Sequence, residues 1–147
     1  MTADLWREIE FFHEGENWGE PMKMEYELLV ELDGLRRFLG KPVTIHEGYA
    51  TSGHATNSAH YWGGAADLHV EGLPLLDQYL AAERFRFTGI GLYPHWNRPG
   101  LHLDVRRRVA GDPEARWWRD AVGAYQALTG DTIRQGALQP PPRPLVG

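Results

Sequence analysis

Apolar residues recur at helical spacing in the first third of the chain. Leu28, Leu32, Leu35 and Leu39 lie three or four positions apart, which predicts a main helix over residues 22–39 with one apolar face. Gly40 and the nearby Pro42 are typical of a helix end, so we place its C-terminus there. The same spacing predicts shorter helices over residues 3–12, 73–85 and 113–129.

Other segments alternate between apolar and polar positions, which is typical of strands with one buried face. The alternation covers residues 43–46, 66–70, 88–93 and 101–106. In the last of these, His102, Asp104 and Arg106 fall on one face, and Leu101, Leu103 and Val105 fall on the other. The pattern therefore predicts an α+β fold with a small, mainly antiparallel sheet flanked by helices.

The length of the chain predicts a single domain. With 147 residues and 42% hydrophobic content, the chain is long enough to bury a core without disulfides. We assign residues 1–130 to this domain and residues 131–147, which end in a proline cluster, to an extended C-terminal tail.

Charge and composition exclude several classes of function. The net charge of -5 argues against nucleic acid as a partner, because nucleic-acid binding requires a basic surface. The chain contains no cysteine, so thiolate metal sites are excluded. No run of 18 apolar residues is present, and the N-terminus lacks the basic and apolar segments of a signal peptide, so we expect neither a membrane span nor a secretory leader.

Two segments carry candidate metal chemistry. The first runs from Ser58 to Asp67 with the sequence SAHYWGGAAD, and the second runs from Gly100 to Arg106 with the sequence GLHLDVR. Together they offer two imidazoles and one carboxylate, from His60, Asp67 and His102. Three nitrogen or oxygen ligands that leave a fourth position open are typical of a catalytic zinc site, so we expect Zn²⁺ to be bound there.

The pattern Ser58-x-His60-x-x-Gly63-x-Ala65-x-Asp67 resembles the signature of the LAS-type zinc peptidases. These include D-Ala-D-Ala carboxypeptidases and dipeptidases, phage L-Ala-D-Glu endolysins and the related hedgehog fold. The segment Gly100–Asp104 is similar to their third-ligand strand, and the resemblance covers roughly residues 5–107. It implies a hedgehog- or DD-peptidase-like fold in which His60, Asp67 and His102 hold zinc.

The same resemblance suggests roles for further residues. Where the family usually carries Gly-Tyr-Arg, this chain has Ala50, so His54 or Arg106 would have to supply the substrate-binding donor. Asp104 and His95 are the two candidates for the general base. Ser58 is expected beside the ligands, and Trp96 is a candidate wall of the substrate cleft.

The implied activity is zinc-dependent hydrolysis of a peptide bond in bacterial peptidoglycan, with zinc-bound water as the nucleophile and the peptidoglycan peptide as the partner. D,D-carboxypeptidase and L-Ala-D-Glu-type endopeptidase activities both fit, as does cleavage of free D-Ala-D-Ala. The alternative is a catalytically impaired zinc-binding module that recognises cell wall or a protein partner, which the change at Ala50 favours. A cytoplasmic or phage-associated protein that acts on the wall after release fits the expected absence of a leader. The sequence does not define the oligomeric state.

Overall fold

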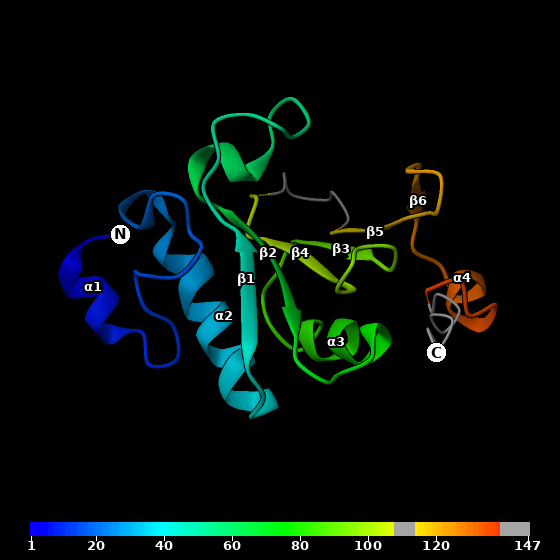
Figure 1. Cartoon of the computed structure of the whole chain (residues 1–147), viewed down its shortest axis with the longest axis horizontal. Helices are drawn as coiled ribbons and strands as arrows, with labels where there is room; N and C mark the ends of the chain where they lie inside the picture. The colour runs from blue at the N-terminus through cyan, green and yellow to red at the C-terminus, as the bar shows by residue number, and fades with distance from the viewer. Residues whose placement is uncertain (108–113, 139–147) are drawn as a thin grey trace, which may run out of the picture.

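The computed structural model describes residues 1–107 and 114–138, which form an α+β fold (Figure 1). The strands of this part of the chain are β1 (Val43–Glu47), β2 (Ala65–Val70), β3 (Gly89–Tyr93), β4 (Gly100–Asp104), β5 (Ala115–Arg119) and β6 (Tyr125–Ala127). Its α-helices are α1 (Ala3–Glu8), α2 (Tyr26–Leu39), α3 (Leu75–Ala82) and α4 (Gly130–Arg134), and 3-10 turns cover Pro21–Lys23 and Ala59–Trp62.

The described strands form one open sheet of six strands in the order β1-β2-β4-β3-β5-β6. All neighbours are antiparallel except β3 and β5, which run parallel. The predicted α+β class and the mainly antiparallel sheet are therefore confirmed. Figure 1 shows α1 at one end of the molecule and α4 with β6 at the other.

The two faces of the sheet have different environments. Five apolar side chains of β1, β2, β3 and β4 point into the hydrophobic core and are at most 2% exposed, namely Ile45, Leu68, Ile90, Leu101 and Leu103. The leucines of α2 pack in the same core, as the helical spacing predicted. The opposite face carries the polar members of the alternating pattern. One face of the sheet therefore packs against the core, and the other presents polar side chains.

The predicted helices differ from the observed ones mainly at their ends. Gly40 adopts a left-handed conformation (φ 62°) and ends α2 as expected. The first helix stops at Glu8 instead of residue 12, because the buried carboxylate of Asp33 accepts hydrogen bonds from the backbone N–H groups of Glu10 and Phe11. The third helix begins at Leu75, directly after Pro74.

The predicted helix over residues 113–129 is wrong. Described residues of this segment form β5 and β6, which are joined by a turn. The Asp120 carboxylate accepts hydrogen bonds from the backbone N–H groups of Val122 and Ala124, and Gly123 has a positive φ of 87°. These local interactions favour a tight turn over a helix. The apolar spacing that suggested a helix comes from Trp117 on β5, Ala121 and Ala124 in the turn, and Leu128 after β6.

The C-terminal segment returns to the domain. Thr129 caps α4 through its hydroxyl, Ile133 packs against the core, and Leu138 is buried within it. Residues 130–138 therefore contact the domain, whereas the proline cluster of the predicted tail lies outside the described residues. No helix within residues 1–107 and 114–138 is both long and apolar enough to cross a membrane.

Candidate metal centre

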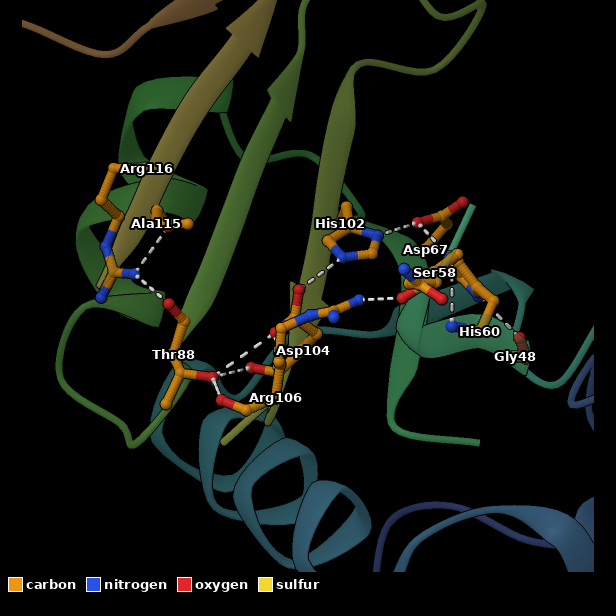
Figure 2. A network of polar contacts seen from close by, with 11 residues as sticks. Gly48, Ser58, His60, Asp67, Thr88, His102, Asp104, Arg106, Ala115 and Arg116 are labelled. Carbon is orange, nitrogen blue, oxygen red and sulfur yellow. Dashed lines mark hydrogen bonds and ion pairs between the residues drawn. The ribbon is translucent and has the colours of Figure 1, made fainter. Parts of the chain in front are cut away.

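Three side chains from different elements converge on the polar face of the sheet. His60 comes from the 3-10 turn Ala59–Trp62, Asp67 from β2 and His102 from β4. One potential ligand atom from each lies within 4.8 Å of the other two. Figure 2 shows both imidazoles directed toward the Asp67 carboxylate. The structure therefore brings together the three residues that the sequence predicted as metal ligands.

The sheet register places Asp67 beside His102. The two residues are direct partners in the antiparallel pair formed by β2 and β4, although they are 35 positions apart in the chain. Their side chains lie on the same face because partners across a ladder point the same way. The His102 Nδ1 atom lies 3.1 Å from Asp67 Oδ1 as a result.

The turn that carries His60 is built by local contacts. The Ser58 hydroxyl accepts a hydrogen bond from the His60 backbone N–H at 3.2 Å, which starts the turn. Gly63 ends the turn with a φ of 80°, and a Cβ at this position would lie 1.9 Å from the Lys23 carbonyl oxygen. Only glycine fits there, so this part of the motif has a structural cause. The turn directs His60 Nε2 to within 3.2 Å of Asp67 Oδ1.

The outward nitrogen of each imidazole is also held. His60 Nδ1 donates to the Gly48 carbonyl oxygen at 2.6 Å, and His102 Nε2 donates to Asp104 Oδ2 at 2.8 Å. These bonds select the tautomers whose inner nitrogens carry a lone pair in the neutral rings, which is the form that a metal ion binds. The donor set therefore fits a divalent metal ion.

The spacing of the donors also suits zinc. Tetrahedral zinc with bonds of about 2.0–2.1 Å holds neighbouring ligand atoms about 3.3 Å apart. The two imidazole nitrogens lie 3.2 and 3.1 Å from Asp67 Oδ1. These two separations are close to that value, and all three candidate ligand atoms lie within 4.8 Å of one another.

The charges of the ligand cluster are strongly coupled. Burial disfavours the Asp67 carboxylate, but hydrogen bonds from His102 and His60 hold its pKa well below the usual range. Burial likewise opposes a charge on His102, but hydrogen bonds to Asp104 and Asp67 outweigh it and raise the pKa of His102 to about 9. Asp67 and Asp104 therefore favour a positive charge between them, either a proton on His102 or a cation in its place.

Asp104 is buried behind His102 and is only 3% exposed. Besides His102, its carboxylate accepts hydrogen bonds from the Arg106 backbone N–H at 3.1 Å and from the Thr88 hydroxyl at 3.4 Å. Figure 2 shows this network at the end of β4. These contacts fit a residue that orients a metal ligand better than one that receives a proton from water.

Glycines on β3 make room for these side chains. A Cβ on Gly89 would lie 2.2 Å from Asp104 Oδ2, and a Cβ on Gly91 would lie 2.4 Å from the Trp117 ring. The Trp117 ring centroid in turn lies 5.2 Å from that of His102. The bare backbone of β3 thus lets Asp104 and Trp117 lie flat on the sheet beside the ligands.

We call the hollow around the three ligands the metal cleft, and its volume is about 380 Å³. Its lining also includes four of the predicted residues, namely His54, Ser58, Asp104 and Arg106, together with the unpredicted aromatic residues Tyr93, Trp117 and Tyr125. The Arg106 guanidinium is the only Arg or Lys group in the lining that the structure describes, and it donates to the Asn57 carbonyl oxygen. Ala50 does not line this cleft.

His54 lies close to the ligand His60. The two rings stack at 4.1 Å between centroids and 17° between planes, and His54 Nε2 lies 3.1 Å from Glu47 Oε1. The Tyr61 hydroxyl bonds to both the backbone N–H and the carbonyl of His54. Glu47 therefore holds a side chain of the cleft in place.

His95 and Trp96 lie elsewhere. They belong to the loop between β3 and β4, and neither lines the metal cleft. His95 is exposed, and Trp96 stacks on Tyr93 with 4.2 Å between ring centroids. The predicted roles of these two residues at the metal therefore have no support in the geometry of the cleft.

Two histidines form a separate chain of contacts at the other end of β2. His46 Nε2 lies 2.6 Å from His69 Nδ1, and His69 Nε2 lies 2.8 Å from Glu71 Oε1. His69 shares the sheet face of Asp67, as the alternation predicted, but it contacts His46 instead of the metal ligands.

Sequence comparisons with known protein families and with curated proteins find no match to this chain. Support for a zinc centre therefore comes from the motif residues and from the geometry of the cleft.

Proposed function

We propose that this chain is a zinc-dependent hydrolase of peptide bonds in bacterial peptidoglycan. One observation carries the proposal: potential ligand atoms of His60, Asp67 and His102 lie within 4.8 Å of one another, and the outward nitrogens of both histidines are held by Gly48 and Asp104. The ligands also line an open cleft, as a catalytic site requires.

The proposed reaction gives roles to several residues of the metal cleft. A bound zinc ion supplies a Lewis acid and lowers the pKa of water. Hydrolysis adds one water molecule across the amide, so that the acyl carbon gains a hydroxyl group, the C–N bond breaks and the nitrogen gains a proton. We assign the orientation of His102 to Asp104, and we assign Ser58 to the turn that presents His60.

Arg106 and His54 are the proposed substrate-binding donors. Arg106 provides the described cationic side chain of the cleft, and His54 is fixed beside His60 by Glu47 and Tyr61. Both compensate for the absence of an arginine at Ala50. A lost donor to a developing oxyanion typically costs about a hundredfold or more in rate. We expect Arg106→Gln to reduce hydrolysis by this order and to leave zinc binding intact.

The test combines metal analysis with hydrolysis. Purified protein loaded with zinc is expected to contain about one zinc per chain, to release new amino termini from purified peptidoglycan and to lose both properties in His60→Ala. His95→Ala is the matched control, because His95 is exposed outside the metal cleft and should leave zinc content unchanged.

The outcomes separate the hydrolase from the zinc-bearing binding module. Zinc binding and peptidoglycan binding without new amino termini would establish the binding module. If the parent protein bound no zinc, both functions would be refuted.

A further inference from the structure

A second cleft adjoins the metal cleft. It has a volume of about 300 Å³ and is lined by Tyr93, His95, Trp96, Arg119 and the turn 120–123. Tyr93 also lines the metal cleft, so one side chain borders both hollows. The two clefts therefore form neighbouring parts of one surface.

The Tyr93 side chain is a firm boundary between the clefts. It stacks on Trp96 at 4.2 Å between ring centroids and 16° between planes. Burial raises the pKa of its phenol, so the hydroxyl stays neutral and can both donate and accept a hydrogen bond. A ring with an apolar face and a polar edge suits contact with a peptide backbone and its side chains.

The hairpin formed by β5 and β6 exposes two large apolar side chains at these clefts. Val122 at its turn is 89% exposed and lines the second cleft, and Tyr125 is 64% exposed and lines the metal cleft. Single exposed apolar residues are common on protein surfaces. Here they border two hollows that share Tyr93, which points to a common ligand.

The strand geometry sets the distance between the metal ligands and the second cleft. Gly91 is the β3 partner of His102, and Tyr93 lies two residues further along β3. Two strand residues span about 7 Å. A free dipeptide with its amide at the ligands has one residue on each side, which reaches only about 3.4 Å. Because Tyr93 already borders the metal cleft, at least two residues on one side are needed to pass Tyr93 and enter the second cleft.

We propose that the substrate is an extended peptide that runs from the metal cleft across Tyr93 into the second cleft. The β5–β6 hairpin then selects peptides that belong to a larger wall fragment over free D-Ala-D-Ala. This inference rests on the proposed function, because the metal cleft defines the position of the scissile bond.

The experiment measures chain-length dependence. Zinc-loaded parent protein is assayed with D-Ala-D-Ala, with stem peptides extended by one residue at a time at either end, and with purified peptidoglycan. We expect kcat/KM to rise at least about tenfold once the substrate has two residues on one side of the cleaved bond. In Val122→Ser and Tyr125→Ala, the ratio between extended and dipeptide substrates is expected to fall toward one, mainly through KM.

Val30→Ser is the matched control, because Val30 is 42% exposed on α2 and lines neither cleft. It should retain the parent ratio. Binding provides a second measurement, which uses calorimetry of the same peptides with chelator-treated protein whose fold is checked by circular dichroism. Extended peptides should bind the parent more tightly than the dipeptide, and both hairpin variants should reduce this difference.

The possible failures are distinguishable. Equal kcat/KM for all lengths, or a parent-like ratio in both hairpin variants, would overturn the extended-substrate inference and leave zinc-dependent hydrolysis standing. Absence of hydrolysis together with length-dependent binding that the hairpin variants abolish would overturn the proposed hydrolase and support the two-cleft peptide site. Absence of both would overturn both.

Discussion

At the scale of single residues, the candidate site depends on groups that are not themselves candidate metal ligands. Gly48 and Asp104 each accept a hydrogen bond from a histidine that faces Asp67. A partner of this kind fixes the ring orientation and raises the basicity of the ligand. A measurement can therefore distinguish whether Asp104 orients His102 or acts as a general base.

Replacement of Asp104 by Asn is expected to weaken zinc binding by about 10–100-fold, because an amide stabilises the His102 tautomer less well than a carboxylate does. A competition titration against a chelator of known affinity measures this change. Asp77→Asn is the control, since Asp77 lies on the exposed side of α3. Unchanged zinc affinity combined with lost hydrolysis would instead identify Asp104 as the general base.

At the scale of the elements, the parts that the sequence predicted are those whose pattern reflects burial. The leucine spacing predicted α2, and the alternation in residues 101–106 predicted β4, because each element buries one face in the core. His60, Asp67 and His102 were predicted from their residue types and from the resemblance of their two segments to the zinc-peptidase signature. The sequence did not indicate the aromatic residues beside the candidate ligands. Trp117 and Tyr125 reach the cleft because the β5–β6 hairpin pairs with β3, which is distant from it in sequence.

The β5–β6 hairpin was missed because a spacing of three or four residues was given more weight than turn chemistry. Asp120 and Gly123 enclose a short turn, and this turn with aromatic residues on either side of it could have indicated two strands. The hairpin is also held by a contact that has no local sequence signal. Arg116 donates from β5 to the carbonyl oxygens of Phe87 and Thr88 and pairs with Glu83.

Truncation of Arg116 to Ala is therefore expected to destabilise the fold by about 2 kcal/mol, because backbone carbonyls and a carboxylate lose a charged donor. Chemical denaturation measures the loss, and hydrogen exchange should locate it in the hairpin. Arg37→Ala should cost clearly less stability than Arg116→Ala, since its pair with Glu10 is exposed to solvent. Equal losses in the two variants would show that Arg116 does not anchor the hairpin.

At the scale of the whole molecule, the hydrophobic core and the candidate metal site lie on opposite faces of one sheet. Leu68 is fully buried on the core face of β2, between Asp67 and His69 on the polar face. A change on the core face should therefore affect unfolding strongly and the chemistry of the cleft only indirectly.

Leu68→Ala is expected to lower the free energy of unfolding by about 2–5 kcal/mol, which is typical of a cavity in a packed core. Urea denaturation of zinc-loaded protein checks this value. Leu80→Ala is the matched control, because Leu80 is 53% exposed on α3 and should change stability by no more than about 0.5 kcal/mol. A small effect at Leu68 would argue against the described packing of β2.

The pairing of Asp67 with His102 has a consequence for how the chain reaches its native state. A slip of β4 by a single position against β2 would turn His102 toward the core and bring Leu101 or Leu103 to the polar side. In such a misaligned chain the three candidate ligands would no longer converge, and zinc would not bind there. Zinc binding would then favour the correct strand register during folding. A chain recovered with full zinc occupancy would be one in which β2 and β4 had paired in the native register.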